Sequence, residues 1–448
     1  MPTRAPHTPP LPDPAGPAVL LLTSKRAYHT DDFVAAAARL GVPCVLGTDR
    51  CHVLAELWPQ GAHALDFRDP DAAATTIAEL HAARPLAGIV PTDEHTAIIA
   101  ARAAARIGLP YNPVEAAELA GNKHRLRQRL RSAGLPQPRF AAVPADAGPD
   151  VVDAALAAAG LGFPVVIKPL HLSASRGVMR ADDRAGLDRC LDRLRALLRD
   201  PEVTAMDPEA ARSILIEGFV PGVEVAYEGL LTASDLRTLA IFDKPDPLDG
   251  PFFAETIYVT PSVQPAAVQD AIVRAVTDAA RAMGLREGPV HAELRLAPHG
   301  WPRMDGAVRP APPVAVVLEL AARTIGGLCH RTLRFGAGIA LDELVIAHAA
   351  GRDIDLPARR AGAASGVYML PVPRPGVLRA VRGVEDASAV AGVQDVVITA
   401  RPGDVLVPLP EGRSYVGFLF AGGPEPAQVT AALRRAVACI ELDIAPLL

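Results

Sequence analysis

The feature that most constrains the fold is the alternation, over the first hundred or so residues, of short apolar runs with Ala-rich amphipathic segments. One helix is predicted to begin with Thr30 as its N-cap and to end at Leu40, because Gly41 is a typical stop signal. Another is predicted to end at Ile107, before a second glycine. Buried strands that alternate with such helices favour a doubly wound parallel sheet. The predicted strands are Val19–Leu22, Cys44–Leu46 and Gly88–Val90.

Polar residues follow each of these strands. The loops after parallel strands converge on one edge of the sheet, where ligands bind. Ser24-Lys25, Asp49-Arg50 and Asp93-Glu94-His95 would therefore share a rim, although ordinary turn and capping roles explain each of them equally well. No G-x-G-x-x-G follows the first strand, so a dinucleotide site is unsupported. The absence of G-x-x-x-x-G-K-[ST] excludes a P-loop.

Length and composition narrow the class of protein. A chain of 448 residues suggests about three units of roughly 150 residues. The net charge of −5, without a long basic run, argues against nucleic acid as a partner. Five scattered cysteines without C-x-x-C spacing indicate a reduced, cytoplasmic protein. No apolar stretch approaches membrane-spanning length, and the Pro-rich residues 1–16 are predicted to be a disordered tail.

The strongest chemical signal is a pair of glutamates on two segments predicted to be neighbouring strands. Alternation of side chains places His291, Glu293 and Arg295 on one face of the first strand. Glu319 and Arg323 share a face of the second, and a polar, Pro- and Gly-rich connection suits an antiparallel pair. Two carboxylates on one side of a sheet repel unless a cation lies between them, and magnesium suits that position. The alternative is two acidic strands with solvated faces.

Positive charge for a triphosphate is available from two lysines. Lys123 opens a basic helix capped by Asn122, and Lys168 ends the apolar strand Val165–Lys168. An ammonium at the end of a buried strand is costly without an anionic partner, although a lysine that reaches to solvent is the alternative. The small residues of Ser173–Gly177 can fold over phosphate oxygens, or form any flexible turn.

The order of these motifs resembles that of the ATP-grasp superfamily. The resemblance extends over about residues 17–448. It implies an α/β ATP-grasp fold with an N-terminal doubly wound parallel-sheet domain, a central lid and core, and a C-terminal α+β domain. The implied bounds are 17–121, 122–340 with the lid at about 140–220, and 341–448. The matching segments are Asn122-Lys123, Gly162–Pro169, Ser173–Val178, Ile216–Glu224, His291–Glu293 and Glu319–Gly327.

The same resemblance implies that ATP is bound at matching positions. Lys123 and Lys168 would contact its phosphates, and a flexible loop would close over them. Glu217, with the backbone through Phe219 and Val220, would read the adenine. The ribose hydroxyls would be held by a further carboxylate, that of Glu224. The loop residues concerned are Ser173, Ser175, Arg176, Gly177 and Val178.

Magnesium is the second implied cofactor, with Glu293 and Glu319 as its ligands. Many members of the superfamily have asparagine two residues after the second glutamate, whereas this chain has Ala321. The number of magnesium ions is therefore left open.

Within the superfamily, Glu319–Gly327 looks most like the L-amino-acid ligases, which make dipeptides and related amides. Arg323 would then bind a substrate carboxylate, for which its planar fork is suited. Glu255 would lie near the substrate amino group, and His291 could assist proton removal from the amine. Each has a plainer interpretation: Arg323 as a partner of Glu319, Glu255 as a solvated loop acid, and His291 as an orienting or structural residue.

The implied reaction is ATP-dependent ligation of a carboxylate to an amine through an acyl phosphate, with release of ADP and phosphate. The implied partners are small carboxylate and amine substrates, amino acids or short peptides, and a homodimer is possible. An ATP-grasp carboxylase that activates bicarbonate as carboxyphosphate shares the same nucleotide motifs and stays an alternative. A regulatory protein without catalysis is disfavoured, because the chain has both glutamates and both lysines.

Overall fold

The computed structural model describes residues 16–24, 27–49, 61–298, 313–335, 338–352, 363–412 and 415–447. Two compact units are present. The first runs to Ala117 and also includes Arg334–Arg359, and the second comprises Glu118–Leu333 and Arg360–Leu448. Lys25, Arg50, residues 1–15 of the predicted tail and most of the connection between the two glutamate strands lie outside the described residues.

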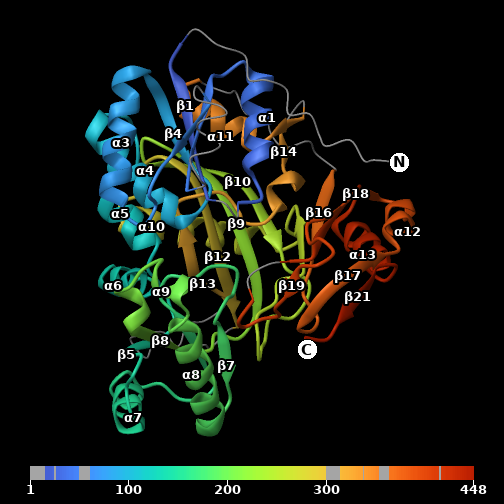
Figure 1. Ribbon diagram of the computed structural model, residues 1–448. Helices are drawn as coiled ribbons and strands as arrows, with labels where there is room; N and C mark the ends of the chain where they lie inside the picture. Colours follow the sequence, from blue (N-terminus) through green and yellow to red (C-terminus); the bar gives the residue numbers. More distant parts are fainter. Residues whose placement is uncertain are drawn as a thin grey trace. The chain divides into compact units, whose positions relative to one another are not determined.

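The first unit contains the predicted parallel sheet, in the order β3-β2-β1-β4 (Figure 1). The three strands expected from the apolar runs are present, each a little longer than predicted, and β3 adds a fourth. Helix α3 packs against α4, and α1 packs against α11. The strands are β1 Ala18–Thr23, β2 Cys44–Thr48, β3 Ala62–Ala64 and β4 Leu86–Pro91. The helices are α1 Thr30–Leu40, α3 Pro70–Ala83, α4 Glu94–Ile107 and α11 Leu341–Ala349.

A distant part of the chain completes this unit. The short pair β14 Arg334–Phe335 and β15 Ile339–Ala340 leads into α11, whose Glu343 forms an ion pair of 2.7 Å with Arg39 of α1. The structure therefore departs from the boundary predicted at residues 340 and 341. A segment that returns to pack on an earlier domain has no local sequence signal, because its burial depends on partners three hundred residues away.

The start of α1 differs from the prediction in one respect. Gly41 adopts the left-handed conformation (φ 59°) expected at the helix end, but the N-cap is His29 rather than Thr30. The hydroxyl of Thr30 instead forms a hydrogen bond of 2.5 Å with the hydroxyl of Thr23, at the end of β1. The strand end thus takes up the side chain that would otherwise cap the helix.

Helix α6, Lys123–Ser132, begins as the sequence predicts, and follows α5 Val114–Ala120. The side chain of Asn122 accepts hydrogen bonds from the backbone amides of His124 and Arg125, both at 3.1 Å. The cap fixes the first turn of the helix, and therefore the position from which Lys123 projects.

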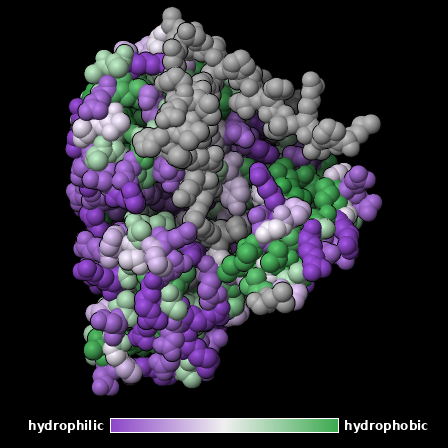
Figure 2. All heavy atoms as spheres, viewed as in Figure 1, coloured by the Kyte–Doolittle hydropathy of each residue, from purple (hydrophilic) through white to green (hydrophobic). Residues whose placement is uncertain are grey.

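Residues 140–218 form a sheet of their own, in the order β5-β8-β6-β7, with α8 against β6 and β7 (Figure 1). Apolar side chains from this sheet and its helices form a separate core, and the surface that the lobe shows in Figure 2 is mostly hydrophilic. The strands are β5 Phe140–Pro144, β6 Val165–Pro169, β7 Met179–Ala181 and β8 Ser213–Gly218. The helices are α7 Pro149–Ala158, α8 Arg184–Leu198 and α9 Pro201–Thr204.

The rest of the second unit is built on one eight-stranded sheet, in the order β13-β12-β9-β10-β11-β16-β20-β18. Helix α10, Ala266–Met283, packs against β13, and α13, Pro426–Val437, packs against β16 and β20. All neighbouring strands in this sheet are antiparallel. The strands are β9 Val223–Thr232, β10 Asp235–Asp243, β11 Ile257–Thr260, β12 Gly288–Ala297, β13 Val314–Ala321, β16 Ala364–Leu370, β18 Val393–Ile398 and β20 Gly417–Gly423.

A three-stranded sheet, β19-β17-β21, and helix α12, Val384–Ala389, complete the C-terminal part. The sequence predicted a closing helix over Pro426–Ile440, but α13 ends at Val437 and a further strand follows it. In the described part of the chain, no helix combines the length and apolar character needed to cross a membrane. The strands are β17 Gly376–Arg382, β19 Val405–Leu406 and β21 Glu441–Ala445.

Gly222 allows β9 to begin directly beside β12. Its φ is +113°, and a Cβ atom at this position would lie 2.1 Å from the carbonyl oxygen of Leu296. Both the backbone conformation and the contact exclude a side chain. Because Glu224 lies two residues further on, this glycine also fixes where that carboxylate projects.

We expect Gly222→Ala to lower the free energy of unfolding by about 2–4 kcal/mol, because the new methyl group meets a backbone carbonyl that cannot turn away. Gly218→Ala is the matched control, since its nearest contact would be an ordinary 3.5 Å to Leu161 Cδ2. Thermal unfolding of both variants checks this, and equal midpoints would contradict it.

Candidate active site

Glu293 of β12 and Glu319 of β13 are direct partners in the antiparallel ladder. Side chains of directly opposite residues emerge on the same face of a sheet. The prediction of two glutamates on one face of neighbouring antiparallel strands is therefore confirmed. The register shifts immediately after this pair, because Leu294 lies opposite Val317. Leu318 is thus the extra residue of a β-bulge that adjoins Glu319.

The neighbouring strand β9 extends this polar face. Glu224 lies opposite Arg295, and Glu228 lies opposite His291. Because these residues alternate with buried apolar ones, the charged side chains gather on one side of the sheet while α10 packs near its β13 edge.

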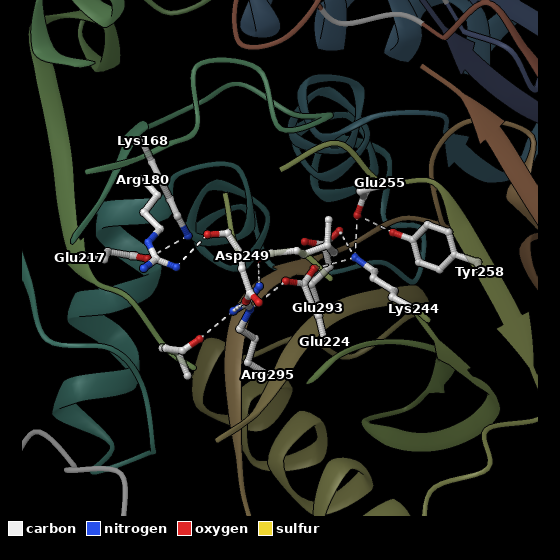
Figure 3. Close-up of polar contacts among 12 residues, drawn as sticks. Lys168, Arg180, Glu217, Glu224, Lys244, Asp249, Glu255, Tyr258, Glu293 and Arg295 are labelled. Atoms are coloured by element: carbon white, nitrogen blue, oxygen red, sulfur yellow. Dashed lines mark hydrogen bonds and ion pairs between the residues drawn. The ribbon is translucent and has the colours of Figure 1, made fainter. Parts of the chain in front are cut away.

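The first charged cluster surrounds Glu217 of β8, which is buried (Figure 3). Nζ of Lys168, on β6, lies 2.8 Å from Oε2 of Glu217, and Nε of Arg127, on α6, donates to Oε1 at 2.6 Å. Burial alone would raise the pKa of Glu217, but the adjacent Arg127 and Lys168 outweigh it and lower the pKa to about 2. The trio carries one more positive than negative charge.

Lys123 joins the lid loop to the glutamate pair. Its ammonium donates to the carbonyl oxygen of Leu172 at 2.6 Å and lies 3.3 Å from Oε2 of Glu319. The lysine that opens α6 therefore contacts one of the two predicted metal ligands directly.

The second charged cluster surrounds Lys244, which directly follows β10 and is buried (Figure 3). Its Nζ lies 2.8 Å from Oε1 of Glu224 and 2.6 Å from Oε1 of Glu255. Oε1 of Glu293 is 3.5 Å from the same ammonium. The hydroxyl of Tyr258, on β11, donates to Oε1 of Glu255 at 2.5 Å. Three carboxylates thus share one lysine.

Electrostatics within this cluster separate the three acids. Burial raises the pKa of Glu255 to about 7, with the charge of Glu293 adding to the effect against Lys244. Burial also opposes ionisation of Glu293, but Lys244 and His291 hold its pKa well below the usual range. For Lys244, burial lowers the pKa, and the three surrounding carboxylates raise it well above its ordinary value. The ammonium therefore stays charged and neutralises the acids.

Arg295 connects the second cluster to the segment predicted to read adenine. Its Nε donates to Oε2 of Glu224 at 3.1 Å, and its Nη1 donates to the carbonyl oxygen of Val220 at 2.9 Å. The ring of Phe219 lies under two guanidinium groups, 4.3 Å from that of Arg180 and 4.8 Å from that of Arg295. Figure 3 shows Arg295 between the clusters.

The predicted phosphate loop is a tight turn. Ala174 and Ser175 both have a φ of +55°, and Gly177 has a φ of +75°. The amide of Gly177 donates to the carbonyl oxygen of Pro410 at 2.7 Å. Nε of Arg176 donates to the carbonyl oxygen of Glu411 at 2.8 Å. In this structure the loop is thus attached to the C-terminal part of the second unit, with Ser173 exposed and Val178 half-buried.

On the opposite side from the lid, Nδ1 of His291 forms a hydrogen bond of 2.6 Å with Oε1 of buried Glu228. Burial lowers the pKa of His291, but hydrogen bonds to Glu228 and Glu293 outweigh it and raise the pKa to about 9. Burial raises the pKa of Glu228, and His291 and Arg323 offset this only in part. Nη1 of Arg323 donates to the carbonyl oxygen of Thr324 at 2.7 Å.

The structure rearranges the expected metal site. Among the described residues, the carboxylates close enough to share one ion with Glu293 are those of Glu224 and Glu255, whose oxygens all lie within 4.8 Å of one another. Glu319 instead contacts Lys123. The assignment of Glu293 and Glu319 as magnesium ligands stays a prediction.

Sequence reasoning missed several residues that the structure places in these clusters. Arg127 carried a recoverable signal, since it follows Lys123 by one helical turn and so lies on the same face of α6. Glu228 and Tyr258 alternate along strands with polar neighbours, a pattern that also fits solvated faces. Lys244 lies in a segment compared with the ligases, but its buried position depends on tertiary packing.

Three family models match the chain in order. An ATP-grasp N-terminal domain matches residues 34–111, an ATP-grasp domain matches 161–330, and the L-amino acid ligase C-terminal domain 2 matches 368–445. The chain belongs to the ATP-grasp superfamily. Within this ATP-grasp chain, the central match includes Lys168, Glu217 and the whole β12–β13 ladder.

Individual proteins are similar to this ATP-grasp chain over different lengths. The uncharacterized protein y4rH of Sinorhizobium fredii is 26% identical, over 95% of this chain and 83% of that protein. The alanine–anticapsin ligase of Bacillus subtilis (strain 168) is 27% identical, over 57% of this chain and 52% of the ligase, and so is matched over about half its length. These similarities support the predicted enzyme class, an ATP-dependent ligase that forms carbon–nitrogen bonds.

The fold of an ATP-grasp protein is also found by structural comparison. The crystal structure of the L-amino acid ligase from Bacillus licheniformis superimposes with a TM-score of 0.73 and 24% identity, over 96% of this chain and 99% of that chain. The predicted α/β ATP-grasp fold, with N-terminal, central and C-terminal parts, is thereby confirmed.

The ion pairs of Glu217 give a pH dependence to stability. Its pKa is lowered from 4.5 to about 2, so its contribution is fully present above pH 4.5 and is lost as the pH falls toward 2. That shift corresponds to about 3 kcal/mol. We expect Glu217→Gln to be less stable than wild type at pH 7, and the difference to shrink steadily below pH 4.5.

Urea unfolding of both proteins at a series of pH values measures this difference. Glu385→Gln, at an exposed position of α12, is the control and should follow wild type throughout. A gap between wild type and Glu217→Gln that is independent of pH would show that the ionised carboxylate is not responsible.

Proposed function

We propose that this chain is a carboxylate–amine ligase that joins amino-acid-like substrates through an acyl phosphate, with release of ADP and phosphate. The observation that carries the proposal is the cross-strand pair Glu293 and Glu319, with Lys123 3.3 Å from the second carboxylate. Acidic groups beside fixed cations are what a nucleotide triphosphate and its metal ion require.

ATP would bind between the lid and the large sheet. The trio of Lys168, Arg127 and Glu217 has an excess positive charge, which favours an anionic phosphate next to Lys168. Because two cations occupy the carboxylate of Glu217, contact with adenine would come from backbone groups of Phe219 and Val220. The loop Ser173–Val178, with Arg176, would cover the phosphates.

The ribose would meet Glu224, which Lys244 and Arg295 already orient. This carboxylate accepts from one cation on each of its oxygens, at 2.8 and 3.1 Å. A carboxylate held in this way presents lone pairs in fixed directions to hydroxyl donors.

The donor set also fits magnesium. The available oxygens come from carboxylates, which are hard ligands of the kind that magnesium prefers. Glu293 and Glu319 would hold the ion, and its chemistry would be to neutralise charge on the triphosphate. Ala321 lies opposite His291 and supplies no ligand atom, so the number of ions stays open. Lys244 provides part of the same neutralisation from the protein itself.

Chemistry would proceed in two steps. A carboxylate oxygen of the first substrate attacks the γ-phosphorus in line, the bond from that phosphorus to the β–γ bridging oxygen breaks, and ADP leaves. Lys168 stabilises the charge on the transferred group. The amine of the second substrate then attacks the acyl carbon, phosphate leaves, and an amide forms. Holding the two reactants together favours this step over hydrolysis.

The substrates would lie beside the second cluster. Arg323 would bind a substrate carboxylate, and Glu255 would face a substrate amino group. Glu228 holds His291 at a fixed angle, so that its Nε2, which lies 3.9 Å from Oε1 of Glu293, is kept near the reacting amine. Cytoplasmic location and a homodimer stay predictions of the sequence.

A matrix of amino-acid pairs incubated with ATP and Mg²⁺ tests the proposed reaction. We expect at least one pair to give ADP, phosphate and a new amide in equal amounts, detected by mass spectrometry. Phosphate release that depends on bicarbonate and not on amino acids would point to the carboxylase instead. Removal of Mg²⁺ with EDTA should abolish turnover.

Lys168→Ala and Glu319→Ala should each lower kcat/KM by about 10³-fold or more, because each removes charge that faces the transferring phosphoryl group. Glu385→Ala, an exposed glutamate of α12, is the control and should keep wild-type turnover. Near-normal activity of either site variant would contradict the assignment.

Arg323→Lys should raise KM for the carboxylate-bearing substrate about tenfold or more and leave KM for ATP within about twofold. A lysine keeps the charge but loses the planar fork that binds a carboxylate through two parallel hydrogen bonds. Steady-state kinetics with each substrate varied in turn separate the two constants. An equal change in both would argue against a substrate role.

A further inference from the structure

Helix α6 projects two cations, one helical turn apart, that each contact both the lid and the large sheet. Lys123 reaches the carbonyl oxygen of Leu172 in the lid and the carboxylate of Glu319 on β13. Arg127 reaches the lid carboxylate of Glu217 and two carbonyl oxygens of β13. The helix is therefore attached to both parts at two successive levels.

Arg127 is completely buried, with 0% of its surface exposed. Its Nε donates to Oε1 of Glu217 at 2.6 Å, its Nη2 donates to the carbonyl oxygen of Leu318 at 2.5 Å, and its Nη1 donates to that of Val317 at 3.2 Å. All three of its nitrogens are therefore used, and each partner lies in a different direction.

The two carbonyls belong to the β-bulge. Leu318 is the extra residue of that bulge and directly precedes Glu319. A bulge changes the direction of the side chains beside it, and a buried carbonyl needs a donor. By hydrogen bonding at this point, Arg127 stabilises the conformation that aims Glu319.

The third partner controls a different part of the site. Glu217 holds Arg127 on one oxygen and Lys168 on the other. The position of the Lys168 ammonium is thus set by a carboxylate that Arg127 itself fixes.

On the basis of the proposed function, we infer that Arg127 is a positioning residue that sets the placement of Lys168 relative to Glu319. These two groups are assigned to the phosphates and to the metal ion, so their separation must match one bound nucleotide. Arg127 contacts neither substrate, because its nitrogens are occupied and its surface is buried. It acts through Glu217 and through the bulge.

Lysine cannot replace arginine in this role. The planar guanidinium presents donors in fixed, diverging directions, whereas an ammonium on a flexible stem is a single point charge. A lysine at position 127 would keep the charge next to Glu217 and leave at least one buried carbonyl without its donor. Arg127→Lys therefore isolates the geometric function from the charge.

The experiment compares wild type, Arg127→Lys and Arg125→Lys. Arg125 is the matched control, because it lies on the same helix but pairs with Glu118 at 3.1 Å on the more exposed side. For each protein we would measure binding of a non-hydrolysable ATP analogue by calorimetry with and without Mg²⁺, thermal stability, and steady-state kinetics with ATP, Mg²⁺ and the amino acids.

We expect Arg127→Lys to stay folded, to weaken nucleotide binding in Mg²⁺ at least tenfold, and to raise the Mg²⁺ concentration for half-maximal activity by a similar factor. KM for the amino acids should change less than twofold, and Arg125→Lys should match wild type. Combining Arg127→Lys with Glu217→Gln should weaken binding by less than the product of the single effects, since both act through one carboxylate.

Unchanged nucleotide and Mg²⁺ dependence in a folded Arg127→Lys would overturn the inference, as would an equal loss in every kinetic constant. If Arg127→Lys does not fold, Arg127→Gln, which has two donors and no charge, takes its place, and failure of both would assign Arg127 to stability alone. A wild type that binds the nucleotide but ligates no amino acids would contradict the proposed reaction and leave the inference intact. A wild type that binds no nucleotide would overturn both.

Discussion

The arrangement of the second unit depends on one buried carboxylate that holds two cations. Glu217 lies on the lid strand β8, Lys168 on the adjacent β6, and Arg127 on α6, which also contacts β13. Removing two positive charges from water is costly, and one carboxylate compensates only part of that cost. The remaining positive charge makes the group receptive to a phosphate, so the electrostatic imbalance of the resting protein and its proposed ligand are two aspects of the same constraint.

The second cluster is arranged in the opposite sense. Three carboxylates surround Lys244, so the group is acidic and attracts cations. A triphosphate and its metal ion have charges of both signs, and the two clusters place complementary charges at different points along one polar face. Arg295 lies between the clusters, bonded to Glu224 and to the backbone of Val220.

Much of this could be predicted from the sequence, because the signals were local. Gly41 ends α1, Asn122 caps α6, and strict alternation along β12 and β13 places Glu293 and Glu319 on one face. Ion pairing could not be predicted in the same way. Neither the sequence around Glu217 nor that around Lys244 shows which cations approach them, since their partners come from strands and helices up to ninety residues away. The return of residues 334–352 to the first unit was missed for the same reason.

The large sheet is continuous from the ATP-grasp strands into the C-terminal ones, because β16 pairs with β11 over Ile257–Thr260. That pairing covers the edge of the strand that carries Tyr258, the donor to Glu255. A chain shortened before β16 would expose a hydrophobic edge next to the acidic cluster, with unpaired amides and carbonyls open to association with other chains. The nucleotide-binding half therefore cannot be separated from its C-terminal extension as an autonomous module, and any exchange of specificity between related enzymes must carry both halves of this sheet together.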